Sequence, residues 1–238
     1  MKKKTKRILL ISIAAAVLAI AAVLIYVFAV YLPDKKEEQA WVEAMQNYYN
    51  TKVEQYAAEN EQYADYEVDV AFLGDSLTDG YDLKTYYPQY VTANRGIGGD
   101  TTHGLENRLD VSVLELKPKV AVMLIGVNNI HTMFENYERI LQSFKENLPD
   151  TKVVLLSLTS MGDSWAKNNQ LAAFNNVKIK ALAEKYGFSF VDLYTPLLDL
   201  DTNEIRPEYT TDGGHLTAEG YVVLTDAITP VLKDLLGY

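Results

Sequence analysis

From residue 66 onward, short apolar runs alternate with longer stretches of helical periodicity. The apolar runs, each with the length and composition of a buried strand, are residues 68–73, 91–94, 120–125, 153–158 and 188–191. The helical stretches lie near residues 101–116, 133–147, 169–186 and 217–236. This alternation predicts an α/β sandwich in which helices cover both faces of a parallel sheet. Ligands of such sheets bind beyond the carboxyl ends of the strands, so the residues that follow each strand are the candidates for chemistry.

The first 32 residues differ in character from the rest of the chain. Lys and Arg side chains within residues 2–7 precede an uncharged run at residues 8–32, in which Ser12 is the one small polar residue. At about 1.5 Å per residue, a helix of this length reaches ~37 Å, enough to cross a hydrocarbon core of about 30 Å. The basic flank predicts a cytoplasmic N-terminus. We therefore expect a cytoplasmic segment at residues 1–7 and a single-pass transmembrane signal anchor at residues 8–32, with the remainder of the chain outside the cell membrane.

A cleaved signal peptide is the alternative for the same segment. Residues 27–29, Val-Phe-Ala, could serve as a small-residue cleavage site, and the protein would then be secreted. Cleaved apolar regions usually hold about 7–15 residues, and the run here is much longer. The length favours the uncleaved anchor, and both interpretations place the rest of the chain outside the cytoplasm.

Residues 33–65 predict a helical stalk ahead of the α/β domain at residues 66–238. Apolar side chains recur at spacings of three, four or seven and form one stripe, which consists of Val42, Met45, Tyr49, Val53, Tyr56 and Tyr63. We expect this stripe to pack on the α/β domain. A parallel dimer seam is the alternative, although Lys52 and Glu59 stand where a second apolar row should continue. The oligomeric state stays open.

Composition excludes several classes of function. The chain has 32 acidic and 22 basic side chains and a net charge of −10, which argues against a nucleic-acid partner because phosphate binding needs clustered Lys and Arg. The absence of cysteine excludes disulfides, thiolate zinc sites and thiol nucleophiles. Three histidines leave little room for a histidine-rich metal cage.

Four short motifs stand at the predicted strand ends or directly before the last helix. They are residues 74–77 (Gly-Asp-Ser-Leu), 96–100 (Gly-Ile-Gly-Gly-Asp), 126–129 (Gly-Val-Asn-Asn) and 212–215 (Asp-Gly-Gly-His). Each motif alone is weak evidence, since Ser76 could cap a helix and the glycine loop lacks the spacing of a dinucleotide fingerprint. Together they predict a hydroxyl, backbone N–H groups and an imidazole at one edge of the sheet.

The histidines differ in their surroundings. Asp100 precedes His103 at the start of a predicted helix, where we expect the aspartate to be the N-cap and the histidine to lie on the surface. Asp212 precedes His215 in a glycine-rich loop, where a carboxylate can orient its neighbour's imidazole, as a serine nucleophile requires. His131 is expected to be exposed. The general base is therefore placed at His215.

These motifs resemble, in order and spacing, the blocks of the SGNH hydrolases, also called the GDSL esterase/lipase family. The similarity runs from about residue 68 to the C-terminal helix. Residues 94–102 and 215–221 are especially similar to the branch that contains the platelet-activating-factor acetylhydrolase catalytic subunits and bacterial acylhydrolases. The resemblance implies the SGNH hydrolase fold, a three-layer α/β/α sandwich with a parallel, flavodoxin-like sheet, over residues 66–238.

The resemblance also implies the roles of individual residues. Ser76 would be the nucleophile, His215 the base and Asp212 its orienting partner. The oxyanion hole would consist of the Ser76 N–H, the Gly99 N–H and the Asn128 side-chain amide. Gly99 is chosen over Gly98 because it directly precedes the aspartate of its block, as in the family.

Two positions depart from the family pattern without removing a catalytic atom. Asn129 stands where many members have aspartate, which the acetylhydrolase-like branch tolerates. Gly214 replaces the more usual leucine before the histidine, which loosens the loop. The implied activity is that of a serine esterase that hydrolyses carboxylic esters through an acyl-enzyme and needs no metal or organic cofactor.

The substrate is the least determined property. An extracytoplasmic position suggests O-acetyl groups of envelope polysaccharide or acyl chains of lysophospholipid, and we favour short acyl esters because no long apolar lid insertion is present. Polar loops at residues 165–169 and 201–212 are expected to shape the alcohol side. Acyl transfer to a sugar hydroxyl uses the same residues and stays open. A catalytically silent glycan-binding protein is disfavoured, since every proposed site position carries a competent residue type.

Overall fold

The computed structural model describes residues 19–24 and 26–237. The chain divides into two compact units, Met1–Thr51 and Lys52–Tyr238. The predicted cytoplasmic segment and the first part of the predicted anchor lie outside the described residues. Within the residues that are described, no helix combines the length and the apolar character that a membrane crossing needs.

The part of the first unit that the structure describes is helical. A π-helical turn, η1 (Val27–Tyr31), leads into α2 (Leu32–Asn60), whose last turns belong to the second unit. Pro33 lies just after the end of η1 and has no N–H to donate to the preceding turn, so the proline and the π-helical turn stand together. From there to Asn60 neither glycine nor proline interrupts the sequence, so the helix runs without a break through most of the predicted stalk.

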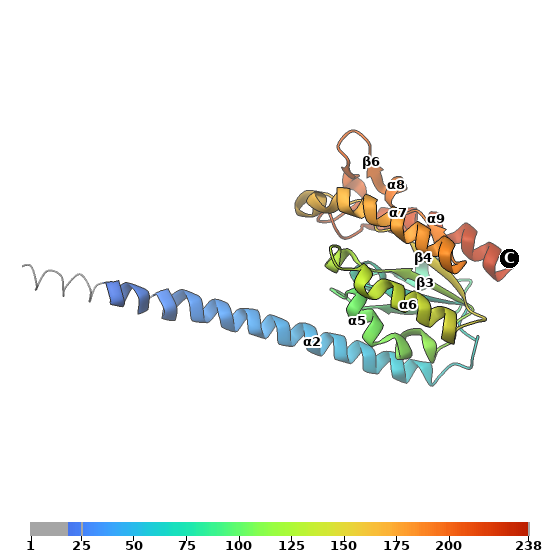
Figure 1. The fold of residues 1–238 in the computed structure, drawn as a ribbon, viewed down its shortest axis with the longest axis horizontal. Coiled ribbons are helices and arrows are strands. Elements are labelled where there is room, and N and C mark those ends of the chain that lie inside the picture. The colour runs from blue at the N-terminus through green and yellow to red at the C-terminus, as the bar shows by residue number, and fades with distance from the viewer. Residues whose placement is uncertain (1–18, 25, 238) are drawn as a thin grey trace, which may run out of the picture. The chain divides into compact units, whose positions relative to one another are not determined.

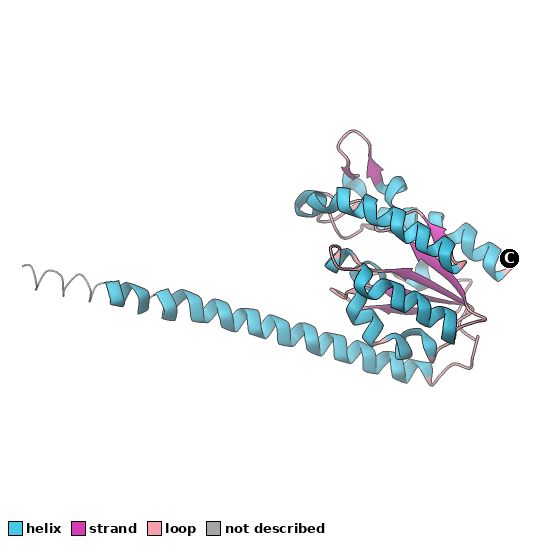
Figure 2. Cartoon of the chain, in the orientation of Figure 1, coloured by secondary structure: helices cyan, strands magenta, loops and turns pink. Residues whose placement is uncertain are grey.

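The second unit is built on a parallel sheet (Figures 1 and 2). Its strands are β1 (Val70–Gly74), β2 (Thr92–Gly96), β3 (Val120–Leu124), β4 (Lys152–Leu156) and β5 (Ser189–Val191), in the order β2-β1-β3-β4-β5. Each predicted strand is confirmed to within two residues. This is the strand order of flavodoxin-like sheets. In such sheets the order in which strands are added reverses between β1 and β3, and ligands bind at that switch point.

Helices cover both faces of the sheet, as predicted. One face packs against α5 (Thr102–Asn107), α6 (Phe134–Asn147) and α7 (Asn169–Tyr186), and the other against α3 (Ser76–Asp79), α4 (Leu83–Tyr86), α8 (Tyr194–Leu197) and α9 (Ala218–Leu236). Successive strand residues point to opposite faces. Ala71 and Leu73 accordingly join the first core, whereas Val70 and Phe72 join the second.

Several short elements escaped prediction because a single turn shows no periodicity. They are α3, α4 and α8, the antiparallel ribbon of β6 (Leu198–Asp199) and β7 (Glu204–Ile205), and the 3₁₀ turns η3 (Val127–Asn129), η4 (Asp163–Asn168) and η5 (Pro207–Tyr209).

The helix predicted at residues 101–116 is interrupted. It forms α5 and, after Arg108, a π-helical turn, η2 (Asp110–Leu114). The Arg108 side chain is buried and donates hydrogen bonds to the carbonyl oxygens of Gly74 and Arg95, at the ends of β1 and β2. The helix is thus interrupted at Arg108, whose guanidinium points inward to the ends of β1 and β2.

Candidate active site

A cavity of about 340 Å³ opens at the carboxyl ends of the strands, where the strand order predicts a ligand. The loops after β1, β2, β3 and β4 and the loop before α9 all contribute to its lining. Among the lining residues are Ser76, Gly99, Asn128, Trp165 and His215. The structure therefore gathers at one cavity residues that are distant in sequence.

Ser76 lies at the sharp turn from β1 into α3. Asp75 caps the helix, because its carboxylate accepts the Leu77 N–H at 3.2 Å, so Ser76 is the first helical residue and not the cap. The N–H of a first helical residue has no partner within its own helix. A Cβ at Gly74 would stand 2.2 Å from the Leu124 carbonyl oxygen, which explains a glycine at this turn. Burial raises the pKa of Asp75 to about 7.

Ser76, His215 and Asp212 form a continuous hydrogen-bonded line. His215 Nε2 is 3.1 Å from Ser76 Oγ, and His215 Nδ1 is 2.8 Å from Asp212 Oδ2. With Nδ1–H donating to the carboxylate, Nε2 presents its lone pair to the serine hydroxyl, the arrangement a general base requires. The chemistry available to this line is deprotonation of Ser76 as it attacks an electrophilic carbon.

Asp212 is fixed by its own loop. Its Oδ1 accepts the backbone N–H groups of Gly214 at 2.9 Å and His215 at 2.7 Å, which leaves Oδ2 for the imidazole. Hydrogen bonds from the His215 side chain and then from its backbone lower the pKa of Asp212 to about 2. The carboxylate therefore stays charged beside the imidazole above that pH.

The glycine loop distinguishes Gly98 from Gly99. The Gly98 N–H donates to Asp79 Oδ2 at 3.1 Å. Gly99 has φ +77°, the third position of a turn that the Asp100 N–H closes on the Ile97 carbonyl, and such turns need glycine there. Among the described residues, the Gly99 N–H has no protein acceptor. Of these two glycines, Gly99 is therefore the one whose N–H remains available to a ligand in the cavity.

Asn128 completes the set of donors that the resemblance implies. It lies in the 3₁₀ turn after β3, and its Nδ2 donates to the Asp100 carbonyl oxygen at 2.8 Å. Since an amide nitrogen carries two hydrogens, one of them remains for a ligand in the cavity. The same hydrogen bond ties the turn after β3 to the glycine loop after β2.

The other histidines lie outside this line. His103 and His131 are both exposed, as predicted, and the His103 ring contacts the amides of Asn107 and Asn136. The predicted role of Asp100 is wrong: Thr101 caps α5 by accepting the Gly104 N–H. Asp100 is instead buried and paired with Arg108 Nε at 2.8 Å, because the buried guanidinium needs a counter-charge.

Trp165 forms a wall of the cavity next to His215. The two rings meet edge to face with centroids 6.5 Å apart. A Cβ at Gly214 would lie 2.8 Å from the indole Nε1 of Trp165. Glycine in place of the family's usual leucine therefore makes room for the indole. By contrast, the described residues 201–212 line neither this cavity nor a neighbouring groove that shares Val127, Asn128 and Trp165 with it.

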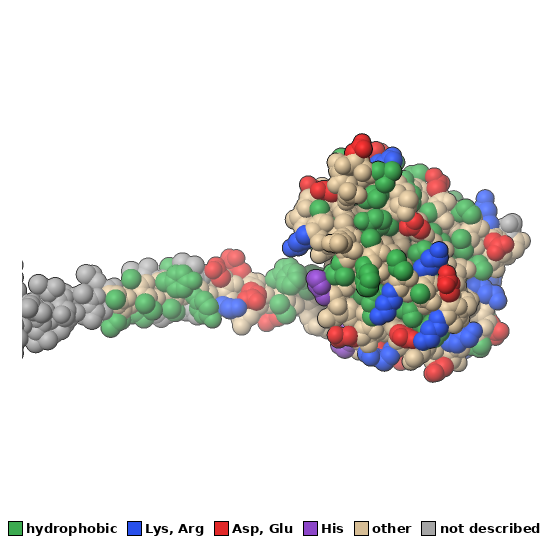
Figure 3. Space-filling model, turned by 45° about the horizontal axis from the view of Figure 1, so that its top comes forward, with side chains coloured by type: hydrophobic (Ala, Val, Ile, Leu, Met, Phe, Trp, Pro, Cys, Tyr) green, Lys and Arg blue, Asp and Glu red, His purple; other side chains and the backbone are tan. Residues whose placement is uncertain are grey.

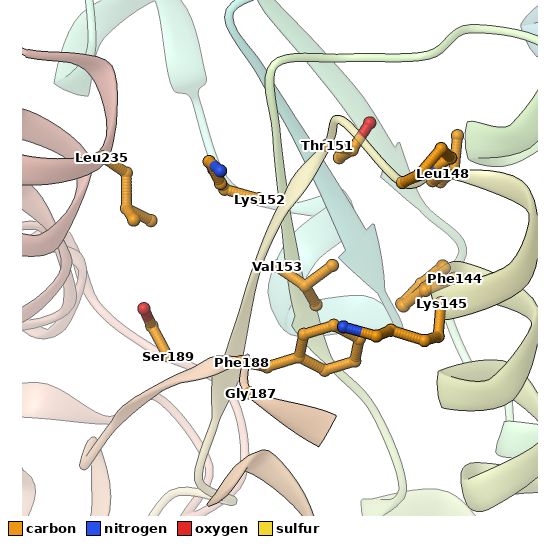
Figure 4. A pocket seen from close by; sticks show the side chains of 11 residues that line it. Phe144, Lys145, Leu148, Thr151, Lys152, Val153, Gly187, Phe188, Ser189 and Leu235 are labelled. Atoms are coloured by element: carbon orange, nitrogen blue, oxygen red, sulfur yellow. The ribbon is translucent and has the colours of Figure 1, made fainter. Parts of the chain in front are cut away.

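A second cavity, at the opposite edge of the sheet, differs in kind. It measures about 220 Å³ and lies by the amino ends of β4 and β5, where Lys152 and Ser189 begin those strands (Figure 4). Its lining side chains include Lys145, Phe144 and Phe188 but no histidine or carboxylate that could activate Ser189. On the face shown in Figure 3, acidic and basic side chains are intermixed.

Comparison with known proteins places the site in a family. The sequence model of the GDSL-like lipase/acylhydrolase family matches residues 72–223, a span that includes Ser76, Gly99, Asn128, Asp212 and His215. The chain belongs to this family. The resemblance inferred from the four motifs is thus confirmed, and the GDSL hydrolase described here is a carboxylic ester hydrolase.

Individual relatives agree with this assignment. Platelet-activating factor acetylhydrolase IB subunit alpha2 of Rattus norvegicus is 30% identical over 187 residues, which cover 72% of this chain and 79% of the relative. A Streptococcus pneumonia structure, provisionally described as a platelet activating factor, is 25% identical with a TM-score of 0.76 and covers 83% of this chain and 99% of its own. A GDSL-like lipase from Bacteroides thetaiotaomicron is 26% identical with a TM-score of 0.68, covering 76% of this chain and 97% of its own.

The two Asp/His pairs can be separated by mutation. We expect His215→Ala to lower turnover of a short aryl ester by at least about 10³-fold, because members of a triad act as a unit. His103→Ala removes an exposed ring of the same kind outside the cavity and should cost less than about tenfold. Steady-state kinetics of the two variants check this, and an essential His103 with a dispensable His215 would show that the base is misplaced.

Proposed function

We propose that this GDSL hydrolase removes short acyl groups, O-acetyl groups above all, from hydroxyl-rich polysaccharide outside the cell membrane. The observation that carries the proposal is the Ser76–His215–Asp212 line at a small cavity, which shares Val127, Asn128 and Trp165 with a neighbouring groove lined mostly by hydrogen-bonding side chains.

The reaction would follow from the positions of these groups. His215 takes the Ser76 proton as Oγ attacks the ester carbonyl, and the resulting oxyanion is held by the N–H groups of Ser76 and Gly99 and the Asn128 amide. His215 then gives its proton to the leaving alcohol, and water resolves the acyl-enzyme by the same steps. Donors set in place before charge develops supply most of the barrier lowering.

The acyl side of the site is small. The cavity of about 340 Å³ is near the lower end of the usual range for ligand pockets, about 300–1,000 Å³. Leu77, Val127 and Met161 contribute apolar walls around the reacting centre. A short acyl group fills such a space, whereas a long chain would have to leave it. The acetyl group in the name of the curated relatives, platelet-activating factor acetylhydrolase, also supports a short acyl substrate.

The alcohol side is open and is lined by many hydrogen-bonding side chains. A groove of about 660 Å³ shares Val127, Asn128 and Trp165 with the catalytic cavity. Its other lining side chains are mostly hydrogen-bonding groups: Asn129, His131, Thr132, Ser164, Lys167 and Asn168. Such groups around one indole suit a chain of hydroxylated rings better than the apolar tail of a lysophospholipid. His215 and Asp212 are 47% and 49% exposed, so a bulky alcohol can reach them.

Substrate preference tests the proposal. Along a series of aryl esters from acetyl to long-chain acyl, kcat/KM should be highest for acetyl, because only short chains fit the cavity. Acetate should be released from O-acetylated xylan, and Ser76→Ala should reduce both activities by at least about 10⁴-fold. Faster release of fatty acid from lysophospholipid would favour a lipid acylhydrolase, and acyl transfer to an added oligosaccharide in place of acetate release would favour an acyltransferase.

We further propose that residues 8–32 anchor the enzyme in the cell membrane with the esterase unit outside. The support is the uncharged run and its N-terminal basic flank. The esterase unit has its own two cores, to which residues 8–32 contribute no side chain among those described, so its activity does not require the anchor.

Deletion of residues 2–32 tests the anchor. The full chain should sediment with membranes and resist extraction at high salt and high pH, whereas the shortened chain should stay in the supernatant with its aryl-ester activity unchanged within a few-fold. Protease added outside intact cells should cleave the full chain. A full chain found in the soluble fraction would contradict the anchor, and a mature N-terminus after Ala29 would identify a cleaved signal peptide instead.

A further inference from the structure

The last turns of α2 contact the loop that supplies Gly99. Tyr56 is 1% exposed, and its hydroxyl donates a hydrogen bond to the carbonyl oxygen of Gly96, the last residue of β2. Lys52 Nζ lies 2.7 Å from Asp79 Oδ1, and Oδ2 of the same carboxylate accepts the Gly98 N–H. The helix thus holds the start of the glycine loop directly and its middle through one carboxylate.

The same helix face also holds the residue before the loop. Arg95 is fully buried, with its guanidinium carbon 4.7 Å from the centre of the Tyr56 ring. Its Nη1 pairs with Glu59 at 2.5 Å, and its Nη2 donates to Asn60 Oδ1 at 3.0 Å. Residues 56, 59 and 60 lie four, seven and eight positions after Lys52, so the four residues share one face of α2. That face contacts Arg95 and Gly96 directly and reaches Gly98 through Asp79.

These contacts matter because the two glycines of the loop bring no side chains to hold it. Gly98 and Gly99 have no side chains and lose more conformational freedom than other residues when they are held in one conformation. An oxyanion donor accelerates the reaction only if it already points to where the charge will develop. Asp79 accepts the Gly98 N–H and so fixes the Ile97–Gly98 peptide, which directly precedes the peptide that carries the Gly99 N–H. Lys52 supplies the positive charge that keeps the Asp79 carboxylate in place.

We propose that Lys52 and Tyr56 are positioning residues of the esterase reaction, which hold the glycine loop so that the Gly99 N–H faces the developing oxyanion. The inference rests on the proposed function, since it assumes that Gly99 is an oxyanion donor. It goes beyond that function because both residues precede the family match, which begins at residue 72. The last turns of α2, which precede the family match, thereby position part of the active site.

Point variants of the full chain test the proposal. Tyr56→Phe removes only the hydroxyl that bonds to Gly96, and Lys52→Ala removes the cation that bonds to Asp79. Lys52→Arg keeps the charge and serves as the rescuing variant. Lys117→Ala is the matched control, because Lys117 forms a similar ion pair with Asp65 at 2.7 Å on an exposed surface away from the loop.

Kinetics on an aryl acetate separate positioning from stability. Loss of a whole oxyanion donor costs about 10²–10³-fold in kcat, so misplacement of one should cost about tenfold. We expect Tyr56→Phe and Lys52→Ala to lower kcat by about this factor with KM unchanged, and Lys52→Arg and Lys117→Ala to stay within about twofold of the parent. A trifluoromethyl ketone, whose serine adduct places an oxyanion in the hole, should bind more weakly in proportion to the loss of kcat/KM.

The outcomes distinguish this inference from the proposed function. If the parent enzyme cleaves the ester and Ser76→Ala does not, the proposed function stands whatever the helix variants do. Variants that keep the parent kcat per titrated active site, even with a lower midpoint of thermal unfolding, would overturn the inference and leave α2 a merely structural role. An equal loss in Lys117→Ala would overturn it as well.

Discussion

Parallel pairing brings the carboxyl ends of three strands to one edge of the sheet, and the site depends on this alignment. Gly74 of β1 pairs with Gly96 of β2 on one side and Leu124 of β3 on the other, so the loops that follow begin side by side. Ser76, Gly99 and Asn128 are therefore neighbours although they come from three different loops. The loop before α9 adds the imidazole and carboxylate to the same edge.

Buried charge links this edge to the body of the protein. The Arg108 side chain is 1% exposed, and it donates to the carbonyl oxygens of Gly74 at 3.0 Å and Arg95 at 2.9 Å while pairing with the carboxylate of Asp100. A buried charge without partners is costly, so the guanidinium and its acceptors depend on one another. The contacts that satisfy the Arg108 guanidinium thus also hold the two strand ends from which the Ser76 turn and the glycine loop start.

Sequence patterns predicted the sheet well because apolar runs record burial, and burial decides where these strands lie. They also pointed to the candidate site residues, since residues 74–77 and 212–215 carry local signatures. The residues that hold those motifs in place could not be predicted from the sequence. Lys52 and Asp79 are 27 residues apart and belong to no motif, and the pairing of Asp100 with Arg108 displaced the expected helix cap. Such contacts depend on which distant side chains the fold brings together. The spacing of residues within a short segment carries no information about them.

The central claim is that Ser76 is the nucleophile of an esterase assembled at this edge, and covalent labelling tests it most directly. The folded enzyme is treated with a fluorophosphonate, digested and mapped by mass spectrometry, with an unfolded sample as the control. The account predicts one adduct, on Ser76, that forms in the folded enzyme alone and is suppressed by His215→Ala. A folded, unlabelled enzyme, or an adduct on another serine with Ser76 unmodified, would contradict it.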